Sequence, residues 1–259
     1  MQKNDVNKFF DATRKGNTRI MKSFLKKGFK IDTKDEFGFT ALMQTTDRSV
    51  DAAKLLLDEG ADIEAKSNEG GTALMYAAYY NQKKILKLLL DRGAKIENKS
   101  HECGTALMYA AEMGHKDVVK ILIDNGAVVN SKNDDGWTAL MWASEMNYFE
   151  IVDLLIKNGA NVNTKDKNNS TPLMHAAERG GANIIKLLIE HGANPNLKDI
   201  HGMTALMYAA TTGNTNAAKI LIEMGGKTKI KDKRGRTVFT IAKERAHKQI
   251  VDLKTIYKL

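Results

Sequence analysis

The sequence repeats itself about every 33 residues, and this period constrains the fold more than any other feature. A tetrapeptide that reads Thr-Ala-Leu-Met, or a variant of it, begins at Thr40, Thr72, Thr105, Thr138, Thr171, Thr204 and Thr237. The first step is 32 residues and each later step is 33. A glycine that ends an apolar run keeps the same spacing at Gly28, Gly60, Gly93, Gly126, Gly159, Gly192 and Gly225. Two independent markers with one period predict a stack of equivalent repeats.

Each repeat has the pattern of two helices joined by a turn. Thr72 is predicted to cap the first helix, because a threonine hydroxyl can accept a hydrogen bond from a free backbone N–H. Pro172 occupies the first helical position of its repeat, where no N–H is needed. Apolar residues three and four positions apart give each helix one buried face. Gly93 is predicted to end the second helix, since glycine readily adopts a left-handed conformation, and a polar turn then leads to the next repeat.

One helix pair leaves apolar surface uncovered, so neighbouring repeats must stack into a continuous core with polar ends. Residues 1–34 and 232–259 combine apolar positions with many lysines, as terminal caps require. We expect an all-α solenoid with β-turn or hairpin loops, forming a single domain over residues 1–259 with about eight repeats including both caps. The expected internal repeats are 35–66, 67–99, 100–132, 133–165, 166–198 and 199–231. The repeat 35–66 is one residue short, which predicts a tighter turn between its helices.

One repeat carries a recognisable signature. Residues 105–111 read Thr-Ala-Leu-Met-Tyr-Ala-Ala, Gly114 and His115 follow, and residues 126–130 read Gly-Ala-Val-Val-Asn. This pattern resembles the ankyrin repeat, whose signature is Thr-Pro-Leu-His-x-Ala-Ala, then Gly-His, then Leu-Leu and Gly-Ala-Asp-Val-Asn. The resemblance covers essentially the whole chain. It departs where the signature His is Met in every internal repeat, which indicates different hydrogen bonding at the start of the first helix.

The sequence contains no motif for catalysis or metal binding. It lacks a phosphate loop, a His-Glu-x-x-His pair, a paired-cysteine motif and a Gly-x-Ser-x-Gly elbow. The six histidines are scattered, and His115 and His247 occupy a slot expected to be structural. We therefore expect no catalytic residue, no metal and no cofactor. Cys103 is the only cysteine, so no intrachain disulfide can form; a reactive thiol at this expected turn tip remains an alternative.

The net charge of +9 is unevenly distributed along the chain. Residues 1–34 hold ten Lys or Arg against three Asp or Glu, and residues 227–259 hold eleven against three. The residues between them hold 19 against 25, so two basic ends flank an acidic centre. This distribution disfavours an evenly basic surface for nucleic acid. The lone cysteine, and the absence of an apolar signal or a long apolar run, predict a cytoplasmic monomer without a membrane span. Export by a route without an apolar signal remains an alternative.

Positions that vary between repeats are the candidates for partner binding. In the ankyrin family, partners commonly contact the turn tips and the exposed end of the first helix. Carried onto this chain, the resemblance predicts these partner-binding residues: Phe37, Phe39, Glu69, Tyr79, Tyr80, Glu102, Glu112, Met113, Asp134, Asp135, Trp137, Glu145, Met146 and Arg179. Aromatic residues and methionines are enriched at protein interfaces. The sequence therefore predicts that a protein segment with an apolar residue flanked by Lys or Arg binds in an acidic, aromatic groove, with Trp137 as an anchor.

Other interpretations of the same residues remain open. The rings can pack along the stack of repeats instead, and packing is the favoured interpretation for Tyr76, Tyr109, Trp142 and Tyr208. The basic ends can bind nucleic acid or another anionic surface, which a steep salt dependence would reveal. A small ligand can stack on Trp137 or Tyr80.

Overall fold

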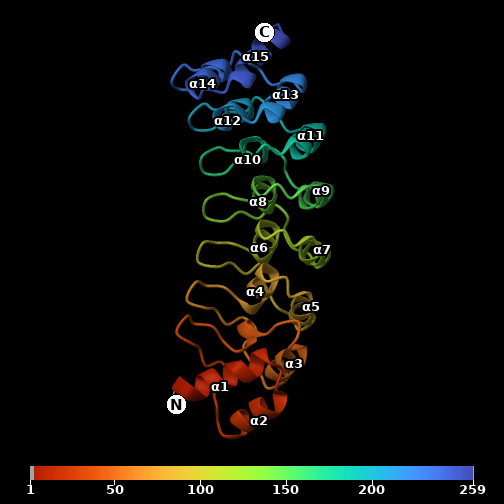
Figure 1. Cartoon of the computed structure of the whole chain (residues 1–259). Helices are drawn as coiled ribbons and strands as arrows, with labels where there is room; N and C mark the ends of the chain where they lie inside the picture. The colour runs from red at the N-terminus through yellow and green to blue at the C-terminus, as the bar shows by residue number, and fades with distance from the viewer. Residues whose placement is uncertain (1–2, 259) are drawn as a thin grey trace. The chain divides into compact units, whose positions relative to one another are not determined.

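The computed structural model describes residues 3–258, and the regular secondary structure of these residues is entirely helical, as predicted (Figure 1). The chain divides into two compact parts, residues 1–128 and 129–259, here called the N-terminal unit and the C-terminal unit. Each is described by itself, and the single domain expected over residues 1–259 stays a prediction. No helix within the described range has the length and apolar character needed to cross a bilayer.

Helix pairs recur through both units. The N-terminal unit contains α1 (Lys3–Arg14), α2 (Thr18–Lys26), the 3-10 helix η1 (Leu42–Gln44), α3 (Val50–Asp58), α4 (Ala73–Tyr79), α5 (Lys83–Asp91), α6 (Ala106–Glu112) and α7 (Lys116–Asp124). The C-terminal unit contains α8 (Ala139–Glu145), α9 (Phe149–Lys157), α10 (Pro172–Arg179), α11 (Ala182–Glu190), α12 (Ala205–Thr212), α13 (Thr215–Glu223), α14 (Val238–Glu244) and α15 (Lys248–Ile256).

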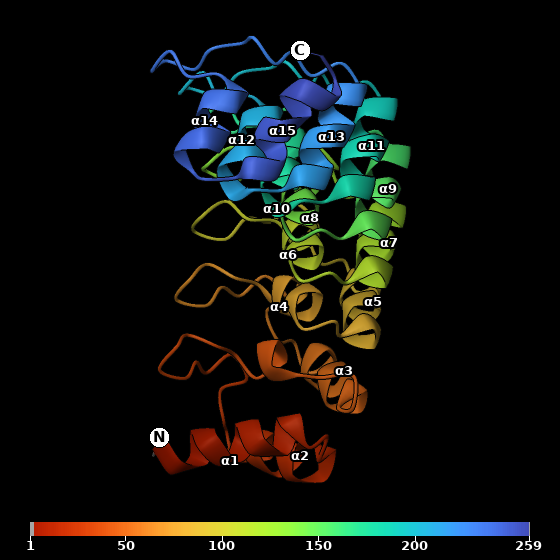
Figure 2. The same cartoon turned by 45° about the horizontal axis from the view of Figure 1, so that its top comes forward.

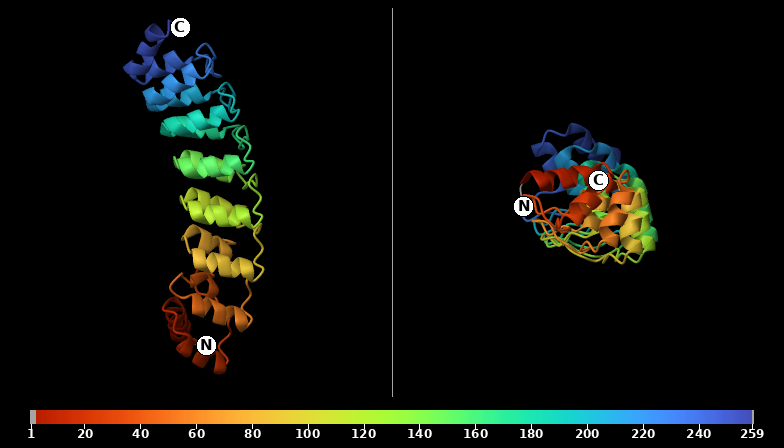
Figure 3. Two further views of the ribbon diagram at one scale, coloured as in Figure 1. Left: turned by 90° about the vertical axis from the view of Figure 1, so that its right-hand side faces the viewer. Right: turned by 90° about the horizontal axis from the view of Figure 1, so that it is seen from below.

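Within each unit, equivalent helices of successive repeats form two rows. In the N-terminal unit α4 packs on α6, while α3, α5 and α7 form the second row. In the C-terminal unit the rows are α8–α10–α12–α14 and α9–α11–α13–α15 (Figure 1), and Figure 3 shows the helices of this unit lying roughly parallel to one another. Ala77 and Ala78 of α4 are buried, and their small side chains allow neighbouring helices to approach closely. Ile85 and Leu89 of α5 provide the buried apolar face of the second row. This arrangement confirms the predicted stack of helix pairs.

A turn tip precedes the first helix of each repeat, and the first residue of the tip closes the turn through hydrogen bonds. The Ser67 N–H donates to the carbonyl oxygen of Gly71 (2.9 Å), while Ser67 Oγ accepts the N–H of Glu69 (3.2 Å). An Asp or Asn side chain accepts equivalent bonds at the tips that begin with Asp35, Asn133, Asp166, Asp199 and Asp232. Neighbouring tips are linked, since the His101 N–H donates to the Glu69 carbonyl oxygen (3.0 Å). Figure 2 shows the tips of the N-terminal unit projecting from α4 and α6, away from α5 and α7.

The predicted threonine caps form in some repeats only. Thr105 Oγ1 accepts the N–H of Met108, at a long 3.4 Å, and the same bond forms at Thr138, Thr171 and Thr237. The predicted cap at Thr72 is wrong, because its hydroxyl makes no capping bond and is buried without a partner. Thr72 has the same extended backbone as Thr105. The cap distance lies at the limit of a hydrogen bond, so a small shift removes it.

The short repeat shortens its first helix rather than its turn. That helix is reduced to η1, and five residues (45–49) then lead to α3, whereas three residues (80–82) separate α4 from α5. The prediction of a tighter turn was therefore wrong. Asp47, in the longer turn, reaches the next repeat, where its Oδ1 accepts the N–H groups of Lys84 (2.8 Å) and Ile85 (3.1 Å). These N–H groups begin α5 and have no partner within the helix, so Asp47 caps α5 from the preceding repeat.

Candidate partner-binding surface

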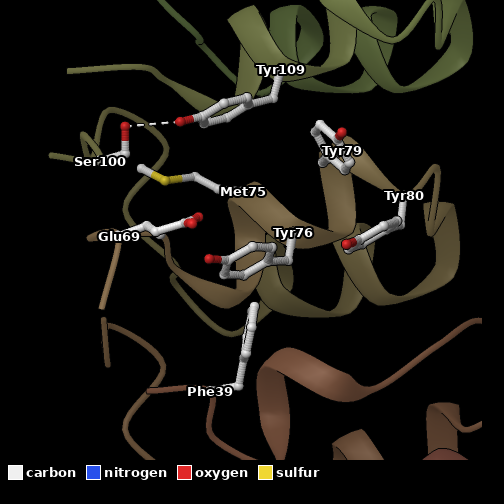
Figure 4. Close-up of a pocket in the computed structure, with 9 residues that line it drawn as sticks. Phe39, Glu69, Met75, Tyr76, Tyr79, Tyr80, Ser100 and Tyr109 are labelled. Atoms are coloured by element: carbon white, nitrogen blue, oxygen red, sulfur yellow. Dashed lines mark hydrogen bonds between the residues drawn. The ribbon is translucent and has the colours of Figure 1, made fainter. Parts of the chain in front are cut away.

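An aromatic pocket of about 350 Å³ lies in the N-terminal unit, between turn tips and first helices (Figure 4). It is lined by Phe39, Glu69, Gly71, Met75, Tyr76, Tyr79, Tyr80, Ser100 and Tyr109. Four of the residues predicted from the sequence therefore meet here: Phe39, Glu69, Tyr79 and Tyr80. Residues from the tips and from the ends of first helices thus form one hollow, which we call the aromatic pocket.

The rings of the aromatic pocket come from three successive repeats and face in different directions. Phe39 lies against Tyr76, with ring centroids 4.7 Å apart and planes at 59°. Tyr79 is nearly perpendicular to Tyr80 (5.0 Å, 83°) and to Tyr109 (6.3 Å, 74°). Tyr80 remains 59% exposed at the end of α4. The rings therefore support one another while leaving a large apolar area open to solvent.

Hydrogen bonds to the turn tips hold two of these rings. Tyr76 Oη lies 2.8 Å from Ser67 Oγ, and Tyr109 Oη donates to Ser100 Oγ at 2.9 Å. Burial raises the pKa of both phenols above the ordinary tyrosine value. The sequence favoured packing for Tyr76 and Tyr109, and it did not identify them as pocket residues. They do both, because each residue is half-buried and also lines the hollow.

Two glycines provide the space for these tyrosines. A Cβ atom at Gly71 would lie 2.8 Å from the ring of Tyr76, and one at Gly104 would lie 2.9 Å from Tyr109 Oη. The same slot of the next repeat holds Trp137. The sequence shows that this slot holds glycine in some repeats and a large residue in others. This difference could have indicated the pocket before the structure was known.

One carboxylate lines the aromatic pocket, and two more lie near Tyr109, which also lines it. Glu69 lines it directly. Burial and the nearby charge of Glu102 raise the pKa of Glu112, and all three carboxylates contribute to the raised pKa of Tyr109 after burial itself. Glu69, Glu102 and Glu112 take part in none of the ion pairs formed among the described residues. Within the part of the chain that the structure describes, these three carboxylates are therefore not paired with a basic side chain.

A second hollow of about 550 Å³ adjoins the aromatic pocket and shares Phe39, Tyr76 and Tyr80 with it. Phe37 lines this hollow from a turn tip and is 62% exposed. Met113, the capping residue after α6, is also exposed. Phe37 and Met113 are therefore exposed, and their role in partner binding stays a prediction.

The remaining predicted residues belong to the C-terminal unit. Asp134 and Asp135 are exposed at a turn tip, and Met146 is exposed at the end of α8. Trp137 is half-buried instead. Its ring lies 4.4 Å from that of Trp142 and 4.4 Å from that of His175, measured between centroids. Trp137 therefore has packing partners inside its unit, which the variety of residues in its slot did not reveal.

Glu145 and Arg179 also have partners inside the C-terminal unit. Arg179 Nε donates to Glu145 Oε1 (2.7 Å), and Glu145 Oε2 lies 3.4 Å from His175 Nδ1. On the other side of the imidazole, His175 Nε2 lies 3.8 Å from Asp166 Oδ2. Burial alone lowers the pKa of His175, but the attraction of the Asp166 and Glu145 carboxylates outweighs it, so the pKa lies above the ordinary histidine value.

This cluster also brings together possible metal ligands. Single ligand atoms of Glu145, His175 and Glu178 lie within 4.8 Å of one another. Arg179 already neutralises Glu145 and would repel a divalent cation at that position. The absence of a metal stays a prediction. The groove predicted across the centre combines residues of both units and also stays a prediction.

Comparison with known proteins gives one family match. A family model described as ankyrin repeats (3 copies) matches residues 9–100, 97–166 and 163–232. Over 83 residues, 30% of this chain, the sequence is 36% identical to the Notch-regulated ankyrin repeat-containing protein of Xenopus tropicalis and covers 73% of it. The Homo sapiens protein of that name is 35% identical over the same shares. The Danio rerio protein named with the suffix A is 35% identical, with 74% of its length covered.

Proposed function

Because the chain belongs to the ankyrin-repeat family, whose repeats generally mediate protein–protein interaction, we propose that it binds a segment of another protein and performs no catalysis. The proposed binding surface consists of the aromatic pocket together with Phe37 and Met113. The partner segment carries an apolar side chain flanked by Lys or Arg.

The observation that carries this proposal is the combination of exposed rings with unbalanced carboxylates. Phe37 and Tyr80 expose most of their surface beside a hollow, and such large apolar groups dominate binding energy at protein interfaces. Glu69, Glu102 and Glu112 favour basic residues beside the apolar anchor, because opposite charges accelerate association and exclude acidic partners.

Three of the partner-binding residues predicted in the C-terminal unit remain part of this proposal. Asp134, Asp135 and Met146 are exposed in the C-terminal unit and stay candidates for contact with the partner. Trp137, Glu145 and Arg179 already contact other side chains of their unit. We therefore propose that these three residues mainly stabilise their unit and contribute less to partner binding.

We further propose that the protein works as a cytoplasmic monomer with one continuous domain. The single cysteine suits a reducing compartment. Binding at the basic ends of the chain remains the alternative, and it would weaken steeply as salt rises.

The experiment begins with a defined partner segment. The full-length chain is cross-linked to proteins of its native host, the linked segment is identified, and a peptide of that segment is titrated by calorimetry. The double variant Phe37→Ala, Tyr80→Ala should bind about tenfold more weakly or worse. Ile20→Ala removes another exposed apolar residue, on α2 and outside both hollows, and should change affinity less than twofold. Unchanged binding by the double variant would contradict the proposal.

A further inference from the structure

We propose that the aromatic pocket takes up one basic side chain of the partner segment, so that its charged end lies against the tyrosine faces and Glu69. This inference rests on the proposed function and deepens it, since it assigns the hollow to a cation and leaves the apolar residue of the partner to Phe37 and the second hollow.

The first argument is the orientation of the rings. Tyr79 stands nearly perpendicular to both Tyr80 and Tyr109, and Phe39 is tilted against Tyr76. Rings in one parallel stack would cover each other's faces, whereas these five rings are not stacked in parallel and all line one hollow (Figure 4). The face of an aromatic ring carries negative electrostatic potential and attracts a cation within about 6 Å of its centre.

The second argument is the origin of the space. The slot that precedes the first helix holds glycine at Gly71 and Gly104, in two consecutive repeats, so no side chain covers Tyr76 or Tyr109 from the tip. In the C-terminal unit the same slot holds Trp137, whose ring lies directly against Trp142, the counterpart of Tyr109. The glycines that leave this space are therefore particular to these two repeats.

The third argument decides between a cation and an apolar side chain. No Lys, Arg or His is among the residues that line the aromatic pocket, whereas Glu69 lines it and Glu102 and Glu112 act on the neighbouring Tyr109. An apolar occupant would remove water from the Glu69 carboxylate and give it no partner, which is costly. A basic side chain places its methylene groups between the rings and its charge beside Glu69, so both parts are matched.

The test uses peptides of the form acetyl-Gly-Gly-X-Gly-Gly-amide, in which X is Lys, Arg or norleucine. Norleucine has an apolar chain of similar length without the charge. The full-length protein, labelled with ¹³C in its tyrosine rings, is titrated with each peptide by NMR. We expect the Lys or Arg peptide to shift the signals of Tyr76, Tyr79 and Tyr109 and to bind at least about fivefold more tightly than the norleucine peptide. The tighter of the two basic peptides identifies the preferred side chain.

Two matched variants locate the binding. Glu69→Gln keeps the size of the side chain and should weaken the basic peptide at least about threefold. Glu59→Gln removes an exposed carboxylate at the end of α3, outside the pocket, and should leave binding unchanged. Equal binding of the norleucine peptide, an unchanged affinity in Glu69→Gln, or no shift of the three tyrosines with any peptide would overturn the inference. If the partner segment still depends on Phe37 and Tyr80 in that case, the proposed function stands and only the cation assignment fails.

Discussion

His115 Nε2 lies 2.9 Å from the carbonyl oxygen of Tyr79, so an imidazole in one repeat holds the end of the first helix in the repeat before it. The last carbonyl groups of a helix have no partner within the helix. The bond therefore satisfies a group that would otherwise lack one, and it fixes the position from which Tyr79 and Tyr80 enter the aromatic pocket.

We expect His115→Ala to lower the free energy of unfolding by about 1–2 kcal/mol, because it leaves the Tyr79 carbonyl without its partner. His115→Asn should restore much of this loss. Asn214 holds the same slot of a later repeat, where its Nδ2 donates to the Glu178 carbonyl oxygen at 2.8 Å. Urea unfolding of the three proteins measures the difference. Equal stability of His115→Ala and the native protein would show that the bond contributes nothing.

Stability of the C-terminal unit should depend on His175 in the pH interval from the ordinary histidine pKa of about 6.5 up to the higher pKa of His175 in the folded protein. Asp166 and Glu145 raise the pKa of His175 in the folded protein, so the folded state binds the proton more tightly than the unfolded state does. The resulting stabilisation is fully present below the unfolded histidine pKa and is lost as the pH rises through the higher folded pKa. Urea midpoints should therefore fall across this interval, and His175→Gln should flatten the decline. A decline of the same size in His175→Gln would assign the effect to other groups.

Trp137→Ala should destabilise the protein by about 2 kcal/mol, because the ring loses its contacts with Trp142 and His175. The sequence alone predicts almost no loss, since the slot accepts residues as different as Gly104 and Arg236. Trp137→Phe keeps an aromatic ring and should lose less than half as much. Thermal melts monitored by circular dichroism distinguish the two expectations, and an unchanged melting temperature in Trp137→Ala would favour the sequence-based one.

Gly126→Val should lower stability by about 1–3 kcal/mol. Gly126 follows α7 with φ +90°, the left-handed conformation predicted for the helix-ending glycines, and a β-branched residue is strained there. No atom lies within 4 Å of the position that a Cβ would take, so the loss comes from the backbone and not from crowding. Gly126→Asn is the control, because asparagine tolerates this conformation and should lose less. Equal losses in the two variants would point to a cause other than backbone strain.

The fold was predictable because its information is periodic. Seven threonines and seven glycines with one spacing specify helix starts and ends, and the structure confirms the helix pairs between them. Details that depend on tenths of an ångström were not predictable. Thr72 and Thr105 share sequence context and backbone conformation, yet only Thr105 forms the cap.

The candidate site was predictable in part, for a related reason. The resemblance placed Phe39, Glu69, Tyr79 and Tyr80 at tips and helix ends, and the structure brings these four together. Glu145 pairs with Arg179, which lies 34 positions later in the sequence. The pairing was not predicted, because charged residues at variable positions were assumed to have no partner within the protein. The space above Tyr76 and Tyr109 exists because Gly71 and Gly104 have no side chain. A prediction based on the side chains that each repeat carries does not detect this space.

The Asp47 cap changes how the short repeat contributes to folding. A repeat protein gains stability from each repeat by itself and from each boundary between neighbours. With its first helix reduced to η1, the repeat 35–66 has little stability of its own, while its bonds to Lys84 and Ile85 strengthen the boundary with the next repeat. The aromatic pocket straddles that boundary, with Phe39 on one side and Tyr76 on the other. Local opening of the short repeat would therefore uncap α5 and dismantle one wall of the pocket in a single event.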